Sequence, residues 1–350
     1  MKVCIFGGWP SAKWLGLLHE LERLGNEVIH WASTVGDADV ARALPVDAPV
    51  VAYSDFTMLE ARARRALVDA DAAVVLSDSP DALEASALVL SSRVPRRVFF
   101  DRDTKRTVDL MSRAETVPWI GDAGLGGFDL VLTSTGGSAP DALRESFGAR
   151  RVVPFPAWVD TRLLAETAEP VDELRCALSL VAHGPLDALS AARVEHLFLQ
   201  PARVRRSERF VLAGASVPEA TRVPRNLQHV SELTDESHAQ LVVSSRLTLH
   251  LAGEGPELLL ETVARGGAVL AESFDGLSEL LEPGEEVLVA ADGVDVLAAL
   301  SLDELFVERL AEAGRARLYA QHTVHHRARQ LTSLLERGAG LYLVGDAASG

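Results

Sequence analysis

In the first half of the chain, Asp101 closes the apolar run RVFFD and Asp103 follows two residues later. Carboxylates at this spacing can bind a divalent metal through oxygen, and either group can orient a substrate hydroxyl or act as its base. Aspartate is also favoured at helix N-caps, and Asp103 or Thr104 stands where a helix is expected to begin. The sequence favours the cap over the metal and leaves both carboxylates as candidate catalytic residues.

Gly7 and Gly8 end the first apolar run, KVCIFG, and precede a helical pattern. Glycines here permit the tight turn and the close backbone approach that a ligand at a helix N-terminus requires. Plain turn chemistry is the alternative. The stretch FGGWPSAKWLG lacks the dinucleotide fingerprint G-x-G-x-x-G, and no acidic residue closes the next run, EVIHWAST. The sequence therefore argues against an NAD-dependent enzyme.

A second small polar segment, Thr135, Gly136 and Gly137, follows the run DLVLTS. Hydroxyls and glycines between a strand and a helix can donate hydrogen bonds to a sugar or a phosphate. Ser138 can instead cap a helix that starts near Pro140, a residue type favoured in a first turn. We favour the ligand interpretation slightly.

Further candidates follow apolar runs in the second half of the chain. His183 and Gly184 follow ALSLVA, and a histidine at a strand end can donate to a phosphate or a sugar. Gly214 ends RFVLAG, with Arg222 and Arg225 nearby as candidate clamps for a pyrophosphate. A structural histidine and solvated surface arginines are the alternatives.

Glu261 begins the stretch ETVARGGAVLAE, in which a helix leads through Gly266 and Gly267 into an apolar run. Its carboxylate is either a surface charge on an ordinary α/β unit or a ligand contact at the end of a sheet. Glu254 lies shortly before it in the sequence.

Three histidines, His322, His325 and His326, lie close together near the C-terminus. Their spacing places them on one helix face without an intervening carboxylate, and it does not match the metal motif H-E-x-x-H. We expect a polar helix surface, or an N-terminal turn capped by Thr323, rather than a metal site.

The bulk composition limits the classes of partner. A chain of 350 residues is long for one core, so two domains are expected. The net charge of −16 argues against a nucleic-acid backbone or an anionic membrane as the main partner, because both need a basic footprint. No run approaches the roughly 18 apolar residues of a membrane span. Cys4 and Cys176 are expected as buried thiols, so we expect a cytoplasmic protein.

Short apolar runs alternate with helical patterns along almost the whole chain. The predicted strands are 2–7, 27–32, 50–55, 72–77, 97–101, 129–135, 151–156, 177–182, 209–214, 226–230, 247–252, 267–272 and 286–290. This alternation predicts an α/β protein with mostly parallel sheets whose faces are both covered. A polar, acidic stretch over 159–175 reads as a linker, and a long helical stretch from Leu302 to about Arg337 ends the pattern. We therefore expect two Rossmann-like lobes facing a cleft.

The order of these motifs resembles the GT-B glycosyltransferases, and within them the spore maturation protein CgeB family. The stretches that carry the resemblance are Phe99–Thr104, Asp129–Gly137, Pro156–Asp160, Phe210–Pro218, Leu260–Ala290 and His322–Leu331. Together they cover nearly the whole chain, in the family's order and at fitting separations.

The resemblance implies an acceptor lobe over 1–160, a donor lobe over 176–320, and a closing helix and tail over 321–350 that pack back toward the first lobe. It implies that Glu261 accepts hydrogen bonds from the ribose of a nucleotide-sugar. The donor side would further include His183, Gly184, Gly214, Arg222, Arg225 and Glu254. The acceptor side would include Gly7, Gly8, Thr135, Gly136 and Gly137.

The expected function is transfer of a sugar from a nucleotide-sugar to an acceptor hydroxyl on a glycan, small molecule or protein, with no metal and no other cofactor. Two positions depart from the pattern: Gly253 stands where retaining relatives have a glutamate, and Leu258 where CgeB-like chains have an arginine. These departures support the alternative of a catalytically degenerate relative that acts as a binding or scaffold subunit. A homodimer and a partner glycosyltransferase both stay open.

Overall fold

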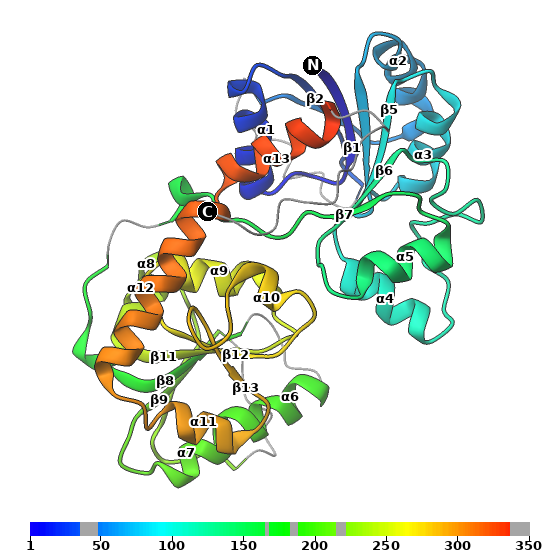
Figure 1. Ribbon diagram of the computed structural model, residues 1–350. Coiled ribbons are helices and arrows are strands. Elements are labelled where there is room, and N and C mark those ends of the chain that lie inside the picture. Colours follow the sequence, from blue (N-terminus) through cyan, green and yellow to red (C-terminus); the bar gives the residue numbers. More distant parts are fainter. Residues whose placement is uncertain (36–47, 165–167, 183–187, 215–221, 337–350) are drawn as a thin grey trace, which may run out of the picture. The chain divides into compact units, whose positions relative to one another are not determined.

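Two compact units make up the chain (Figure 1). The computed structural model describes residues 1–35, 48–164, 168–182, 188–214 and 222–336. Unit 1 consists of Met1–Pro156 and the C-terminal segment that begins at Val324, and unit 2 consists of Ala157–Thr323. The structure therefore places the predicted linker in unit 2 and the last helix in unit 1.

Unit 1 is built on a seven-stranded parallel sheet with the order β3-β2-β1-β4-β5-β6-β7. Its strands are β1 (Lys2–Gly7), β2 (Glu27–Ser33), β3 (Val50–Tyr53), β4 (Ala72–Leu76), β5 (Arg96–Asp101), β6 (Leu130–Thr133) and β7 (Val152–Pro154). Its helices are α1 (Ala12–Arg23), α2 (Phe56–Val68), α3 (Ala82–Ser91), α4 (Thr104–Ser112), α5 (Ala139–Phe147) and α13 (Val324–Glu336). Each strand falls on an apolar run that the sequence predicted.

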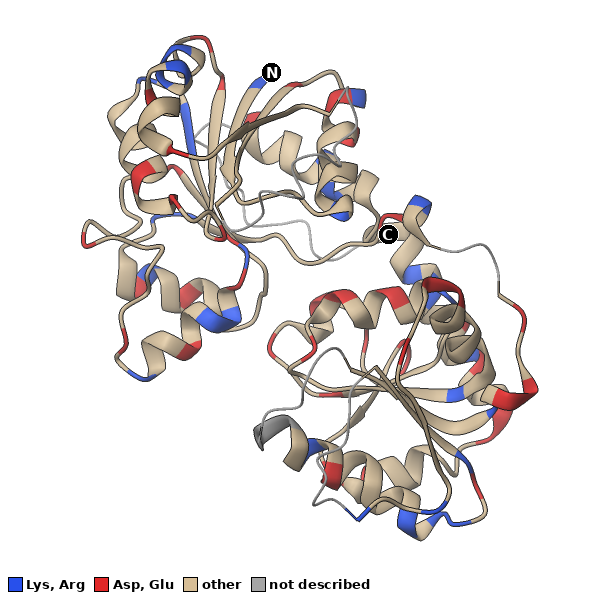
Figure 2. Cartoon of the chain, turned by 180° about the vertical axis from the view of Figure 1, so that it is seen from behind, with Lys and Arg blue, Asp and Glu red and all other residues tan. Residues whose placement is uncertain are grey.

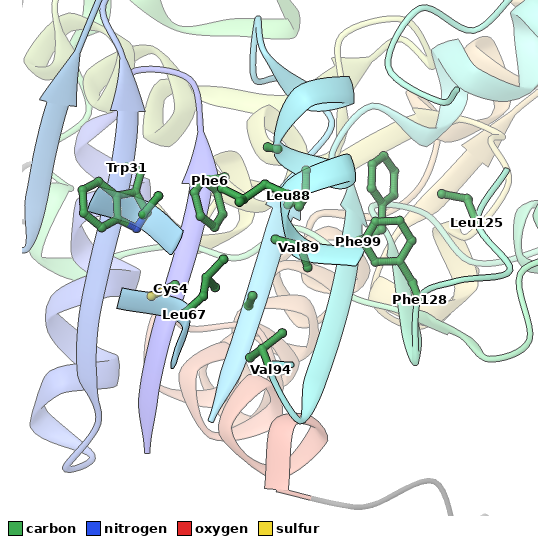
Figure 3. Packing of buried hydrophobic residues seen from close by; sticks show 14 of the residues in the cluster. Cys4, Phe6, Trp31, Leu67, Leu88, Val89, Val94, Phe99, Leu125 and Phe128 are labelled. Carbon is green, nitrogen blue, oxygen red and sulfur yellow. The ribbon is translucent and has the colours of Figure 1, made fainter. Parts of the chain in front are cut away.

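Both faces of this sheet are buried, as continuous rather than alternating hydrophobicity predicts. Every residue of β4 and of β6 is buried. On one face, Phe6, Trp31 and Phe99 pack with Leu88 and Phe128 (Figure 3). Other large, fully buried side chains are Ile5 on β1 and four residues of α1, namely Trp14, Leu17, Leu18 and Leu21.

Helix α13 belongs to unit 1 through contacts with α1 and β7. The imidazole Nδ1 of His325 lies 2.8 Å from Oε1 of Glu20 on α1. The buried guanidinium of Arg327 donates from Nε to the carbonyl of Pro156 at 2.9 Å, and Gln330 donates to the carbonyl of Pro154 at 3.2 Å. The expected return of the C-terminal helix to the first lobe is therefore confirmed.

Unit 2 is built on a six-stranded parallel sheet with the order β10-β9-β8-β11-β12-β13. Its strands are β8 (Cys176–Val181), β9 (Phe210–Ala213), β10 (Leu227–Val230), β11 (Ser245–His250), β12 (Val269–Glu272) and β13 (Leu288–Ala290). Its helices are α6 (Ala188–Val194), the π-helical turn η4 (Glu195–Leu199), α7 (Gln200–Val204), α8 (Asp235–Ser244), α9 (Pro256–Ala264), α10 (Leu277–Leu280), α11 (Gly293–Ala299) and α12 (Glu304–Gln321). Two short 3₁₀ turns, η2 (Thr161–Leu163) and η3 (Asp172–Leu174), occupy part of the predicted linker.

The predicted C-terminal helical stretch is two helices. Helix α12 ends at Gln321, and α13 begins at Val324 on the other side of the unit boundary. Between them, His322 is 3% exposed, and its carbonyl accepts a hydrogen bond from the amide of Val159 at 2.9 Å. The expectation of a polar helix surface is therefore wrong for His322, whereas the alternative, a helix N-terminus at Thr323, agrees with the start of α13 at Val324.

The remaining sequence-level expectations concern thiols, charge and membrane spans. Cys4 and Cys176 are both unpaired and buried. Acidic residues are spread over both units in Figure 2, and their excess gives the net charge of −16. Among the described helices, none is both long enough and apolar enough to span a membrane.

Candidate functional site at the strand ends

Both sheets have a point at which the strand order reverses, between β1 and β4 in unit 1 and between β8 and β11 in unit 2. In open parallel sheets, ligands bind beyond the carboxyl ends of the strands at such a point. In unit 2, β8 leads to His183 and Gly184, which lie outside the described residues. The site in unit 2 is therefore described from the β11 side.

Strand β11 passes through a short glycine-rich loop into α9, which carries Glu261. The helix begins at Pro256, and its N-cap Gly255 has a φ of +77°, a conformation that favours glycine. Glu261 lies half-buried in the second turn of the helix. Glu254, also half-buried, stands in the loop itself. Glu254 therefore stands in the loop that follows β11, and Glu261 stands on the helix whose N-terminus begins at this sheet edge.

Leu258, which also lies on α9, is a buried packing residue. It is 8% exposed and packs in an apolar cluster with Val181, Val211, Ala213 and Leu241, at and beyond the ends of β8 and β9. An arginine at this position would have its charged head among these apolar side chains, which is costly without a partner. The departure from the CgeB-like pattern is thus part of the packing of unit 2.

The loop before α9 is held by an ion pair that sequence analysis missed. Oε2 of Glu272, the last residue of β12, accepts the amide of Ala252 at 3.0 Å, and Oε1 lies 3.3 Å from Nε of Arg193. A Cβ built on Gly253 would come within 3.3 Å of the Arg193 guanidinium. Because residue 253 is a glycine, no side chain enters the space next to the Arg193 guanidinium. Only an alignment of strand ends could have indicated Glu272, and Arg193 carried no local signal.

Gly214 lies at the carboxyl end of β9 and is required there. Its φ is +83°, and an added Cβ would lie 2.4 Å from the carbonyl oxygen of Ala182. The structure does not bring Arg222 and Arg225 to this end. Arg225 precedes β10 and lies with Arg206 and Arg209 at the amino ends of the strands, and the Arg222 carbonyl accepts a hydrogen bond from Arg203. Neither arginine is placed as a diphosphate clamp. Both lie on the connection from β9 to β10, which must return the chain to the amino ends of the strands because the two strands are parallel.

His250 is the last residue of β11 and is buried, with 4% of its surface exposed. Burial lowers the pKa of its imidazole to about 4. The ring packs edge-on against Phe274 at 6.0 Å between centroids. The histidine is therefore neutral near pH 7 and contributes an uncharged, buried base at the centre of the sheet end.

In unit 1, Gly7 and Gly8 lie at the reversal point between β1 and β4. A Cβ on Gly7 would come within 2.7 Å of Leu76 and 2.9 Å of His30, and one on Gly8 within 3.1 Å of the Asp78 carbonyl. Nε2 of His30 lies 3.1 Å from the Gly8 carbonyl. Close packing, beyond simple turn chemistry, thus explains the glycine pair.

The side chain of Arg102 lies beside this glycine pair, and the sequence did not indicate it as a site residue. The guanidinium of Arg102 lies 4.6 Å from the ring centre of Trp14 and 2.5 Å from the carboxylate of Asp78. These residues come from α1 and from the ends of β4 and β5, so they share the carboxyl edge of the sheet. Cation–π and ionic contacts hold the arginine at that edge.

The two aspartates of the first half have different positions. Asp101 is completely buried, and burial raises its pKa to about 6. Among the described residues no donor forms a well-aligned hydrogen bond with either carboxylate oxygen, although the hydroxyls of Thr107 and Ser77 lie near enough to oppose part of the shift. Asp103 is exposed and caps α4, accepting the Arg106 amide at 3.2 Å. The capping alternative is therefore confirmed for Asp103.

Thr135, Gly136 and Gly137 lie between β6 and α5, at the same sheet edge as Asp101. Gly137 has a φ of +62° and is exposed, while Gly136 is buried. The loop is tied to α4 by Ser134, whose amide donates to the Thr104 hydroxyl at 2.9 Å. Within the described parts of the chain, no group of three histidine, cysteine, aspartate or glutamate side chains is placed to hold a metal.

Comparisons with known proteins agree with this geometry. Residues 193–333 match the profile of a family described as glycosyl transferase-like. A comparison with curated protein sequences gave no match. Sucrose-phosphate synthase from Thermosynechococcus elongatus is 14% identical with a TM-score of 0.65, covering 95% of this chain and 98% of its own. Anabaena HepE in complex with UDP-glucose is 13% identical with a TM-score of 0.64, covering 96% and 99%.

A third solved structure, an α-glucosyltransferase in complex with UDP, is 12% identical with a TM-score of 0.63. It covers 96% of this chain and 100% of its own. The chain has the GT-B fold. The two parallel-sheet lobes expected from the sequence are thus confirmed, with seven strands in the first and six in the second.

Proposed function

We propose that this GT-B protein is a glycosyltransferase that moves a sugar from a nucleotide-sugar to an acceptor hydroxyl. The observation that carries the proposal is the position of Glu261, on the helix that directly follows the central strand β11 of unit 2. The glycosyl transferase-like match includes this strand, its loop and the helix. Similar structures that hold UDP or UDP-glucose support a nucleotide-sugar as the donor.

In this proposal, Glu261 accepts hydrogen bonds from the ribose diol of the donor. The amides at the start of α9 and the loop containing Glu254 face the diphosphate, because a helix N-terminus stabilises negative charge. Departure of the nucleoside diphosphate then relies on preorganised donors. Gly214 keeps the neighbouring strand end free of a side chain.

On the acceptor side we propose Gly7, Gly8 and the loop of Thr135, Gly136 and Gly137. Asp103 is the exposed carboxylate of its pair and can orient an acceptor hydroxyl, whereas burial gives Asp101 a structural position behind the sheet end. The motif order further supports a CgeB-like relative as the subgroup.

The test is binding of UDP-glucose by calorimetry to wild type, Glu261→Ala and the control Glu308→Ala, an exposed glutamate on α12. Loss of charge-assisted hydrogen bonds at about 1.5–3 kcal/mol each should weaken binding roughly 10- to 100-fold in Glu261→Ala only. A nucleotide-sugar panel should replace UDP-glucose if wild type does not bind it. Absence of binding by every donor at millimolar concentration would sink the proposal.

A second candidate function is a binding or scaffold subunit without transferase activity. Buried Leu258 and the glycine at 253 favour it, because they remove two polar side chains that the resemblance places at the donor. Incubation of the pure protein with UDP-glucose discriminates the two. Release of free glucose or transfer to an added acceptor excludes the scaffold, and donor binding without turnover across an acceptor panel supports it.

A further inference from the structure

Unit 2 contains a cavity that shares the Arg193–Glu272 ion pair with the loop before α9 but is lined by none of Gly214, Glu254 and Glu261. Its volume is about 470 Å³, within the range of roughly 300–1,000 Å³ typical of small-molecule sites. It lies between the π-helical turn η4, helix α7, the start of α11 and the end of β12. Residues on its wall include His196, Leu197, Pro201, Glu272, Val294 and Leu297.

The shape of the cavity is set by direct packing of α11 on the π-helical turn. A Cβ added to Gly293 would come within 2.9 Å of the His196 carbonyl, so the two segments meet backbone to backbone. Asp292 caps α11 by accepting the Val294 amide at 2.7 Å. A π-helical turn is uncommon and occurs most often at functional positions.

The cavity has one polar wall, formed by the ion pair of Arg193 and Glu272. Both oxygens of Glu272 already have partners, in Arg193 and in the Ala252 amide. Arg193 contacts Glu272 through Nε, and its terminal amino groups donate to no acceptor among the described residues. This wall therefore offers unused donors and few unused acceptors.

The rest of the cavity is mainly apolar and ends in an apolar lip. Val204 and Val294 line the cavity and are 65% and 71% exposed. Exposed apolar groups around a cavity are typical of a surface that binds another molecule. Leu197, Pro201 and Leu297 continue the apolar wall inward.

The charges around the cavity favour a neutral occupant. Arg193 is balanced by Glu272, and the nearby Asp292 together with a net charge of −16 disfavours an anion. A cation would meet the unused donors of Arg193. We propose that this cavity binds a neutral, mostly apolar small molecule that carries a hydroxyl or carbonyl oxygen, with that oxygen directed at Arg193. This site goes beyond the proposed glycosyl transfer and does not depend on it.

Four matched probes test the chemistry: benzyl alcohol, toluene, benzoate and benzylamine, each followed by ligand-observed NMR on the full-length protein. Benzyl alcohol should bind with a dissociation constant of roughly 1 mM, as expected for a fragment of its size. Toluene lacks the oxygen and should bind about tenfold more weakly. Benzoate and benzylamine should also bind more weakly. Equal binding of all four, or of none, would overturn the inference.

Two exposed lip residues locate the binding without touching the core. Val294→Trp and, independently, Val204→Trp should fill the mouth and abolish benzyl alcohol binding. The matched control is Val68→Trp, at the end of α2 in unit 1, where the wild-type valine is 78% exposed. Benzyl alcohol binding that survives both lip substitutions, or that falls equally in the control, contradicts the assignment.

A second readout separates this inference from the proposed function. UDP-glucose binding should be unchanged in Val294→Trp and reduced in Glu261→Ala, with the opposite pattern for benzyl alcohol. Loss of both ligands in Val294→Trp would show that the cavity is part of the donor site and overturn the inference. Failure of the protein to bind any nucleotide-sugar would leave the benzyl alcohol result fully interpretable.

Discussion

Units 1 and 2 share the same doubly wound strand order but treat the ends of their central strands differently. In unit 1, Gly7 and Gly8 are packed against Leu76, His30 and the Asp78 backbone. In unit 2, the loop after β11 has an exposed glycine, Gly253. The glycines at the first sheet end are closely packed by their neighbours, whereas the loop at the second is exposed at Gly253 and held by an ion pair.

This difference teaches that topology locates a possible site, while local side chains decide whether it is filled. The same crevice exists wherever the strand order reverses. In unit 1 a tryptophan-stacked arginine, Arg102, occupies the edge. In unit 2 an arginine of a different element, Arg193 on α6, pairs with Glu272 beside the loop.

The largest expected effect comes from comparing two glycines that have nearly the same φ but different surroundings. Gly214 of unit 2 and Gly25 of unit 1 have φ values of +83° and +84°, yet nothing lies within 4 Å of a Cβ on Gly25. Gly25→Ala should therefore cost only the left-handed strain, about 1 kcal/mol of unfolding free energy. Gly214→Ala adds a clash with a backbone carbonyl and should cost more than about 3 kcal/mol. Urea unfolding of both variants measures this, and equal losses would refute the role of close packing at the end of β9.

The second effect concerns the buried carboxylate of unit 1. The folded-state pKa of Asp101, about 6, lies above its ordinary value of 3.8, so its contribution to stability is full below pH 3.8 and lost as pH rises through 6. Asp101→Asn should remove this loss and raise the unfolding free energy at pH 8 by up to about 3 kcal/mol. The gain should vanish below pH 4. Asp103→Asn, an exposed cap, is the control and should change little at either pH.

The buried histidine of unit 2 should give the opposite pH dependence. Its pKa of about 4 lies below the ordinary 6.5, so the neutral ring is favoured in the folded state and stability is lost as pH falls from 6.5 through 4. His250→Gln should therefore flatten the acid limb of the stability curve by up to about 3 kcal/mol at pH 4. An unchanged acid limb, measured by urea unfolding at pH 4 and pH 7, would rule out His250 as its source.

The smallest effect compares the two arginines at the sheet ends. Arg102 and Arg193 make partly exposed ion pairs, with side chains each 27% exposed. Partly exposed pairs contribute modestly, so Arg102→Met and Arg193→Met should each cost about 1 kcal/mol of unfolding free energy. A loss of several kcal/mol in Arg193→Met alone would mean that the loop before α9 is essential to the fold of unit 2.

Much of the fold could be predicted from the sequence, because each described strand coincides with a predicted run and most of these runs are apolar throughout. Such runs follow from sheets buried on both faces, and this is a local property of the chain. The sequence offered the break between α12 and α13 only as an alternative, through Thr323 as a helix cap. The structure decided for it, because the chain passes from unit 2 to unit 1 at this point and His322 is buried.

The candidate site could be predicted where it follows directly from a strand. Gly214 and Glu254 follow strands closely in the sequence and lie just after β9 and β11 in the structure, whereas Glu261 stands on the helix that follows β11. Arg225 was misplaced because it, too, stands near a strand, but at the amino end. Distance along the chain does not say at which end of the sheet a loop residue lies.

By itself, the sequence determined the two parallel-sheet lobes and the order of the strand-end motifs. Only the tertiary structure decided which charged groups meet. It buried Asp101 and raised its pKa, and it paired Arg193 with Glu272 from a different strand end. The physical reason is that apolar periodicity is encoded locally, whereas desolvation and ion pairing depend on neighbours that the fold brings together.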